Sequence, residues 1–276
     1  MPGMSVLRYT AFSDRPEGGN PAGVVLDAAG LSDEQMLAIA ADLGYSESAF
    51  LQGDELRYFS PLAEVPFCGH ATVATAVALA ERDGPGDRVF ATRNGPVPVS
   101  SRRDDQGRLT ATLTSVAPRV EPLGGDDLDE LLAALRWAPE DLDPALPPRV
   151  AFAGVHHPIL ATRTRERLAD LDYDFDRLGA LMAARDWTTI QLVWREDPLR
   201  FHARNPFPPG GVVEDPATGA AAAAFGAYLR ELGLIEPPTT ITILQGEDMG
   251  RPSRLLVDLH PGRAEVDVTG MAVPIS

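Results

Sequence analysis

Two segments that combine one glycine with a run of alanines constrain the fold of this chain more than any other feature. They begin at Val65 (VPFCGHATVATA) and at Glu214 (EDPATGAAAAAF). Aligned on Gly69 and Gly219, they match at Ala71 with Ala221, Ala74 with Ala224 and Leu79 with Leu229. Each follows a strand-like run with a shared opening, Leu56-Arg57-Tyr58 in one case and Leu199-Arg200-Phe201 in the other. The pattern predicts two similar halves, each containing one helix of small residues.

A loop that runs directly into such a helix predicts an anion-binding position. The first backbone N–H groups of a helix have no partner within the helix, and the helix dipole adds positive potential there. We therefore expect the helix starts at Gly69 and Ala71, and at Gly219 and Ala220, to bind a small carboxylate-bearing molecule in a cleft between two lobes.

Length, charge and hydropathy exclude several classes of protein. The 276 residues are enough for two ordinary domains, with 44% hydrophobic and 23% charged residues. The net charge of −16 argues against a nucleic-acid partner, because phosphate contacts need clustered basic residues. No apolar run approaches the ~20 residues that span a bilayer, and the N-terminus lacks the pattern of a secretion signal. We expect a cytoplasmic protein without a membrane partner.

The cysteine and histidine content predicts no metal site. Cys68 is the single cysteine, which excludes an internal disulfide and a mechanism that uses two cysteines for proton transfer. The five histidines form no His-x-x-x-His pair, and no cysteine joins them at the spacing typical of zinc ligands.

The distribution of apolar residues and turns predicts an α+β protein in which strands outnumber helices. A capping box at Ser32–Gln35 starts a helix that ends at Gly44, and a further helix is expected over 128–135. Because small residues allow close packing on all sides, both alanine-rich helices are expected to be buried. We predict two pseudo-symmetric lobes, each a curved, mostly antiparallel sheet or barrel around a central helix. Residues 1–120, completed by a C-terminal strand at 264–276, would form the first lobe, and residues 121–263 the second.

Three side chains are candidates for catalysis, and each also has an ordinary structural interpretation. Glu47 lies in a strand between serines, where partial burial would raise its pKa towards neutrality; the alternative is a strand glutamate that faces water. His70 lies in the first turn of the Gly69 helix and could donate to a substrate carboxylate, or it could be a structural cap. Asp215 precedes Pro216 and could orient a substrate amine or hydroxyl, or simply form the turn. The glycine-rich loop around Arg251 is interpreted as a structural turn.

Taken together, the motifs resemble the phenazine-biosynthesis PhzF-like family of isomerases and epimerases. The matching stretches run in order from residue 12 to residue 253: Phe12, GNPAGVV at 19–25, SESAF at 46–50, RYFSP at 57–61, EV at 64–65, CGHAT at 68–72, EDPATG at 214–219, and QG at 245–246 with MGRPS at 249–253.

This resemblance implies the diaminopimelate-epimerase fold, an active site between two lobes, a homodimer, and catalysis without a metal or organic cofactor. It also implies that Glu47 is the acid/base that moves a proton between substrate carbons, and that His70 and Asp215 contact the substrate and assist. Asn20, Gly69, Ala71, Gly219 and Ala220 fall at positions expected to bind the substrate.

One departure concerns Ala220. Family members that act on the phenazine precursor typically have serine there, whereas alanine has no hydroxyl to bond a substrate group. We expect an isomerase or epimerase acting next to a carboxylate-bearing or conjugated carbon, with isomerisation of dihydro-hydroxyanthranilate as one form. The alternative is a small-molecule binding protein that kept the cleft and lost turnover.

Overall fold

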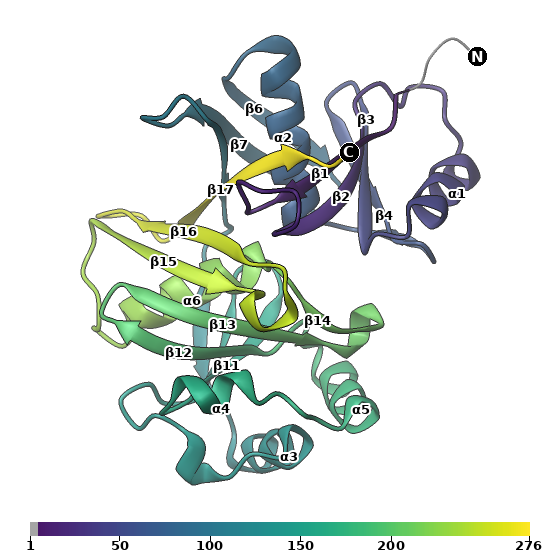
Figure 1. Cartoon of the computed structure of the whole chain (residues 1–276). Coiled ribbons are helices and arrows are strands. Elements are labelled where there is room, and N and C mark those ends of the chain that lie inside the picture. Colours follow the sequence, from purple (N-terminus) through teal and green to yellow (C-terminus); the bar gives the residue numbers. More distant parts are fainter. Residues whose placement is uncertain (1–4) are drawn as a thin grey trace. The chain divides into compact units, whose positions relative to one another are not determined.

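The computed structural model describes residues 5–276 and consists of two compact units (Figure 1). The first contains the chain up to Thr114 together with Thr269–Ser276, and the second contains Ser115–Val268. Within the described residues, no helix is both long enough and apolar enough to cross a membrane.

The first unit is a closed barrel of eight strands. Each strand pairs with the next around the barrel, and the last pairs with the first. In order they are β1 (Leu7–Ala11), β2 (Asn20–Val25), β3 (Glu47–Gln52), β4 (Glu55–Phe59), β6 (Asp87–Thr92), β7 (Gly95–Arg103), β8 (Leu109–Thr114) and β17 (Val266–Pro274). The short strand β5 (Glu64–Val65) pairs with β4 outside this circuit.

The alanine-rich helix α2 (Gly69–Asp83) is the core of this barrel. Every residue from His70 to Ala80 is buried, and the helix packs against β1, β2, β3, β7 and β8. Small side chains on all sides let strands approach the helix closely around its whole circumference. The predicted central helix is therefore confirmed in the first lobe.

The second unit repeats this pattern of pairing. Its strands are β9 (Arg119–Pro122), β10 (Arg149–Phe152), β11 (His156–Ala161), β12 (Gln191–Asp197), β13 (Arg200–Phe207), β14 (Val212–Asp215), β15 (Thr239–Gln245) and β16 (Ser253–Leu259), and its buried helix is α6 (Gly219–Glu231). In the first unit three antiparallel pairs, β1–β2, β3–β4 and β6–β7, are joined by parallel pairing. In the second the same scheme joins β10–β11, β12–β13 and β15–β16. The predicted pseudo-symmetric α+β fold is confirmed.

The limits of the two units differ slightly from the expected limits of the lobes. The first unit ends at Thr114 and the second begins at Ser115, whereas we expected the first lobe to continue to residue 120. The difference arises because β9 pairs with β10 of the second unit. At the other end, β17 begins in the second unit and enters the first at Thr269, where it pairs with β1.

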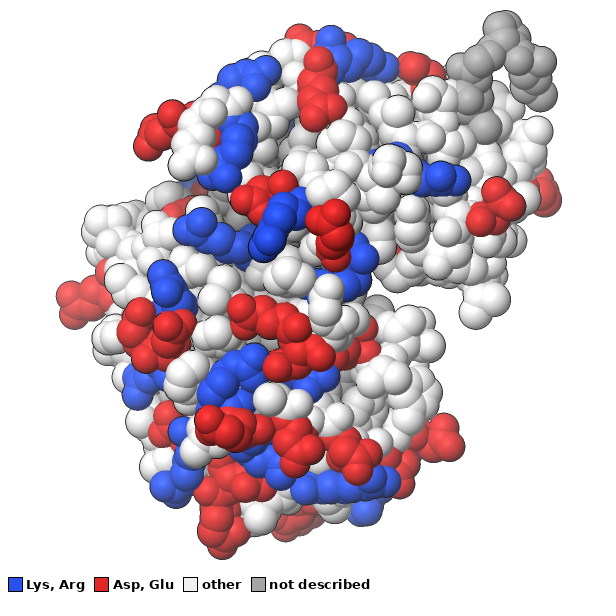
Figure 2. Space-filling model, in the orientation of Figure 1, with Lys and Arg blue, Asp and Glu red and all other residues white. Residues whose placement is uncertain are grey.

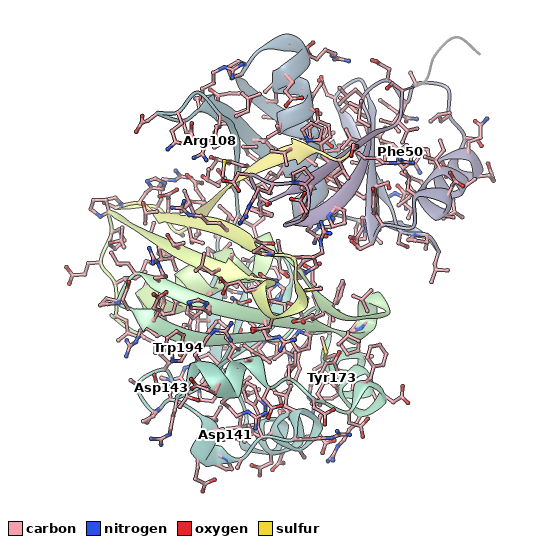
Figure 3. The ribbon with its side chains drawn as sticks, viewed as in Figure 1. Phe50, Arg108, Asp141, Asp143, Tyr173 and Trp194 are labelled. Atoms are coloured by element: carbon pink, nitrogen blue, oxygen red, sulfur yellow. The ribbon has the colours of Figure 1, made fainter. Side chains whose placement is uncertain are left out.

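The remaining helices cover the outer faces of the sheets. Helix α1 (Asp33–Leu43) starts with the expected capping box, since Ser32 and Gln35 exchange both hydrogen bonds, and it ends at Gly44 with a φ of 67°. Its buried face packs on Phe50 of β3, which is labelled in Figure 3. Burial of this apolar face, more than helix propensity, holds α1 in place.

The second unit contains two helices that the sequence analysis did not predict. They are α4 (Arg165–Ala169) and α5 (Phe175–Arg185), and α5 packs with the expected helix α3 (Gly125–Leu135). Thr164 and Asp174 cap α4 and α5 through their side chains. Few residues of α4 and α5 are buried, so each helix presents only a short apolar stripe to the core.

Charges of opposite sign lie next to one another on the face shown in Figure 2. All the basic residues are arginines, and many make ion pairs with acidic neighbours, including Arg177 with Glu130 and Arg185 with Asp127. Exposed pairs of this kind contribute little to stability individually.

Candidate active site

Three chemically active side chains near the start of α2 form one cluster in the first unit. Nε2 of His70 lies 3.7 Å from Oε2 of Glu47. Sγ of Cys68 lies 3.7 Å from the same oxygen and 3.3 Å from Nδ1 of His70. A carboxylate, a thiol and an imidazole therefore meet at the first turn of the central helix.

The strand register explains how residues distant in sequence reach this cluster. Glu47 is the first residue of β3 and is paired in parallel with Ala22 of β2. Cys68 is the N-cap of α2, and His70 is the second residue of that helix. The His70 ring is also hydrogen-bonded to the backbone carbonyl of Pro21, next to Ala22. The β2–β3 pairing and the helix start thus converge on Glu47.

Burial controls the charge of His70. The residue is only 5% exposed, and the removal of water lowers its pKa below the usual value, although the Glu47 carboxylate and the Pro21 carbonyl oppose this shift. The neutral ring predominates at neutral pH. Because one ring nitrogen donates to Pro21, the other is an acceptor.

The start of α2 has backbone donors that its own side chains do not cap. The N-cap residue Cys68 makes no side-chain capping bond, and the first turn contains no acidic residue. Gly69 is half-buried, while Ala71 and Asn20 are buried. Binding of an anion by the backbone at Gly69 and Ala71 remains a prediction.

In the second unit, Asp215 is held by its surroundings rather than standing in an open turn. It is the last residue of β14 and is 8% exposed. Its Oδ2 accepts a hydrogen bond of 2.5 Å from the Thr218 hydroxyl, and its backbone oxygen accepts one of 2.7 Å from Gln245 Nε2. Gln245 also accepts from the Thr218 backbone N–H through Oε1, at 3.1 Å. Gln245 therefore fixes the segment that leads from Asp215 into α6.

The loop after Gln245 supports this arrangement through its backbone. Gly246 has a φ of +76°, and a side chain there would lie 2.4 Å from the Arg251 carbonyl oxygen and 2.8 Å from that of Pro216. Only glycine fits so close a backbone approach. The interpretation of this loop as a structural turn agrees with the hydrogen bond from Arg251 N–H to Gly246 O.

Helix α6 begins as α2 does. Thr218, its N-cap, makes no side-chain capping bond, and no acidic residue lies in the first turn. Gly219 is buried and Ala220 is half-buried. The central helix of each unit therefore starts without a side-chain cap, with Glu47 and His70 beside α2 and Asp215 beside α6. That both sets act on one substrate remains a prediction.

Sequence reasoning missed two ion pairs, one half-buried and one buried. Arg57 on β4 binds Glu64 through two hydrogen bonds, and Arg204 on β13 binds Glu214 in the same two-point manner. The shared Leu-Arg opening suggested Arg200 as the counterpart of Arg57, but Arg200 is half exposed and pairs loosely with Glu196. In each unit the arginine–glutamate pair connects the segment before the central helix to a strand of the sheet.

A second missed feature is a buried polar group in the second unit. Thr189 contacts Nδ1 of His157 at 2.9 Å and accepts from Asn205 Nδ2 at 3.0 Å, and Gln191 lies on the adjoining strand. All four are at most 1% exposed. Burial lowers the pKa of His157 to about 4, so its ring is neutral. Because these residues belong to separate strands, no local motif reveals the group.

This duplicated α+β fold, with a carboxylate and an imidazole at the start of a buried helix, defines a class of isomerases and epimerases. The chain belongs to the phenazine biosynthesis-like protein family, PhzC-PhzF, whose family model matches residues 9–276.

Related proteins and solved structures agree with this family assignment. The chain is 32% identical to "Uncharacterized isomerase YfhB" of Bacillus subtilis (strain 168), over 97% of this chain and 95% of that protein. It is 33% identical to the trans-2,3-dihydro-3-hydroxyanthranilate isomerase of Pseudomonas fluorescens, over 95% and 94%. A PhzF-family phenazine biosynthesis protein of Bacillus anthracis has a similar crystal structure, with a TM-score of 0.89 and 27% identity over 98% of this chain and 96% of that one. The chain is a PhzF-like isomerase.

Proposed function

We propose that this isomerase moves a proton between carbons of a small carboxylate-bearing substrate, without a cofactor, and that Glu47 is the acid/base. The observation that carries the proposal is the position of the Glu47 carboxylate, 16% exposed, beside His70 at the uncapped start of α2. A general base needs access to the substrate together with nearby groups that stabilise developing charge. Both requirements are met within the first unit.

In the proposed reaction, Glu47 takes a proton from a carbon next to the substrate carboxylate or in conjugation with it. The electron pair left on carbon delocalises onto oxygen or along the conjugated system, where the N–H groups of Gly69 and Ala71 stabilise the negative charge. The protonated Glu47 then returns the proton to another carbon, or to the other face of the same carbon. No atom or electron is gained or lost, so the step is an isomerisation or an epimerisation.

His70 has a different part in this scheme from the one expected of a charged donor. Its ring is neutral, and Nε2 lies 3.7 Å from Glu47 Oε2. We assign it the role of receiving a hydrogen bond from protonated Glu47 or from a substrate hydroxyl or ammonium group. Asp215 is proposed to orient a polar substrate group, with the N–H groups of Gly219 and Ala220 beside it.

The substrate class rests on the two helix starts and on the Pseudomonas fluorescens relative. That relative is named for its action on trans-2,3-dihydro-3-hydroxyanthranilate, and a cyclic amino-hydroxy acid of this type belongs in the test panel. The alanine at position 220 removes a hydroxyl donor, so other amino acids and hydroxy acids belong there too. A homodimer and a cytoplasmic location remain part of the proposal.

The test is exchange of substrate hydrogen with heavy water. The protein is incubated in deuterium oxide with dihydro-hydroxyanthranilate, amino acids and hydroxy acids, and each C–H signal is followed by NMR. We expect exchange with at least one compound, reduced by about 10³-fold or more in Glu47→Gln, because a general base typically contributes about 10²–10⁴-fold. The matched control is Glu55→Gln, which changes an exposed glutamate at the start of β4.

An active Glu47→Gln variant would refute the role of Glu47. Exchange that is lost equally in Glu55→Gln would refute the assignment to this site. A panel without any exchange, combined with ligand-induced thermal stabilisation by one of its members, would favour a binding protein over the proposed reaction.

A further inference from the structure

We propose that Glu47, Cys68 and His70 form a binding site for one thiophilic divalent cation, with Zn²⁺ as the physiological candidate, and that occupation of this site inhibits the enzyme. The metal site stands on geometry and donor chemistry alone. Only the inhibition rests on the proposed function, because it requires Glu47 to be the acid/base.

The geometry of the three donor atoms matches a metal site. Sγ of Cys68, Nε2 of His70 and Oε2 of Glu47 form a triangle with sides of 3.7 Å, 3.7 Å and 3.8 Å. The centre of such a triangle lies about 2.2 Å from each corner, close to the ~2.0–2.3 Å of zinc bonds to oxygen, nitrogen and sulfur. A cation can therefore contact all three atoms with shifts of only a few tenths of an ångström.

The donor set selects for a particular class of ion. One thiolate, one imidazole and one carboxylate are three ligands of the kind that zinc accepts, with a fourth position left for water. Mg²⁺ and Ca²⁺ prefer sites made of oxygen ligands, so they compete poorly with Zn²⁺ or Cd²⁺ at a thiolate. Binding releases the Cys68 thiol proton to the solvent, so affinity rises with pH.

The surroundings of the cluster favour coordination. The hydrogen bond from the His70 ring to the Pro21 carbonyl is an outer contact of the kind typical of histidine ligands. Cys68 and His70 are 7% and 5% exposed, whereas the Glu47 side chain is 16% exposed. Glu47 therefore provides the route by which an ion enters.

His202 also lies beside carboxylates, but its contacts are those of ordinary hydrogen bonds and not those of a metal site. His202 has carboxylates on both sides, but Nδ1 is 2.6 Å from Glu247 Oε2 and Nε2 is 3.0 Å from Glu196 Oε2. These are ordinary hydrogen bonds that occupy both nitrogens of the ring, and no thiol lies in that cluster because the chain's one cysteine is Cys68. His202 is therefore the matched control position.

Metal binding and proton transfer are mutually exclusive at Glu47. A cation on Oε2 lowers the proton affinity of the Glu47 carboxylate, because its positive charge favours the unprotonated form. Removal of the cation restores the base. The same three residues thus make the enzyme reversibly sensitive to zinc.

The experiment uses the full-length protein after dialysis against a chelator. Cd²⁺ is titrated while the thiolate-to-cadmium charge-transfer absorption is followed in the ultraviolet, and Zn²⁺ affinity is measured by competition with a chromophoric chelator. Because the chain has a single cysteine, any such absorption reports Cys68 directly. The variants are Cys68→Ser and Glu47→Gln, with His202→Gln as the control.

We expect saturation at one cadmium per chain, loss of the absorption in Cys68→Ser, and Zn²⁺ affinity at least about tenfold lower in Cys68→Ser and in Glu47→Gln. His202→Gln should bind as the unmodified protein does. A cadmium titration without thiolate absorption overturns the site even if Cys68→Ser fails to fold. Zinc affinity that falls only in His202→Gln overturns it as well.

The metal site and the proposed isomerase reaction can be refuted independently of each other. If no compound exchanges hydrogen but Cd²⁺ binds with the thiolate signal, the metal site stands and the proposed reaction fails. If hydrogen exchange is observed and one equivalent of Zn²⁺ leaves it unchanged, the inhibitory site is refuted while the reaction stands.

Discussion

The buried histidine of the second unit leads to a quantitative prediction about stability in acid. His157 is fully buried, and the removal of water lowers its pKa from 6.5 to about 4, with the hydrogen bond to Thr189 opposing the shift and His156 adding to it. A histidine in the unfolded chain keeps a pKa near its model value. Between these two pKa values the unfolded state therefore binds more protons than the folded state, and stability falls as the pH falls.

The magnitude follows from the size of this difference. Each pKa unit corresponds to about 1.4 kcal/mol, so the difference between a pKa of 6.5 and one of about 4 corresponds to about 3 kcal/mol once both states are fully protonated. The contribution is complete above about pH 6.5 and is lost as the pH falls towards 4. At about pH 4.5 the linkage relation gives a loss of about 2–3 kcal/mol.

The assay is urea unfolding, followed by circular dichroism, of the unmodified protein and His157→Asn. Asparagine keeps a polar atom near Nδ1 for Thr189 and does not titrate. We expect the stability difference between the two proteins to be constant from about pH 7 to 9 and to change by about 2 kcal/mol in favour of the variant at about pH 4.5. All other titrating groups are common to both proteins and cancel. A difference that stays constant down to about pH 4.5, or one of opposite sign, would refute the reasoning.

Two further substitutions test packing and pairing. Gly226→Ala in α6 should destabilise the protein by about 1–2 kcal/mol in urea unfolding, because the new Cβ would lie 2.7 Å from Val257 Cγ1 and this clash outweighs the helix propensity of alanine. Gly125→Ala is the control, since nothing lies within 4 Å of a Cβ at that position. Equal effects of the two substitutions on stability would contradict the packing argument. Glu214→Gln should lower stability by about 3–5 kcal/mol because it leaves the buried Arg204 without its carboxylate. A loss below about 1 kcal/mol would show that Arg204 finds water or another acceptor.

The predicted elements that agree with the structure share a local physical cause. The capping box at Ser32 and Gln35 needs only four consecutive residues, and both of its hydrogen bonds form. The small residues of α2 and α6 encode burial on every side, so the two central helices could be placed before any strand pairing was known. Helix α5 is amphipathic, but with only Leu178 and Met182 buried its short apolar stripe was not interpreted as a helix.

The candidate site was only partly predictable. The sequence identified Glu47, His70 and Asp215 singly, from their positions next to turns and helix starts. It did not bring Glu47 to Cys68, because that contact depends on the parallel pairing of β2 with β3 and on the start of α2. The absence of a local metal-ligand spacing led to the prediction of no metal, whereas the structure assembles three donors from separate segments.

The sequence by itself determined the family, the duplicated α+β design and the two uncapped helix starts, because each depends on short-range patterns of residue size, turn and cap. The tertiary structure alone decided which side chains meet. The Arg204–Glu214 pair, the buried group around His157 and the cluster at Glu47 all join separate strands or a strand to a helix. Strand register sets such contacts, and register is fixed by the burial of a whole face of the sheet rather than by neighbouring residues.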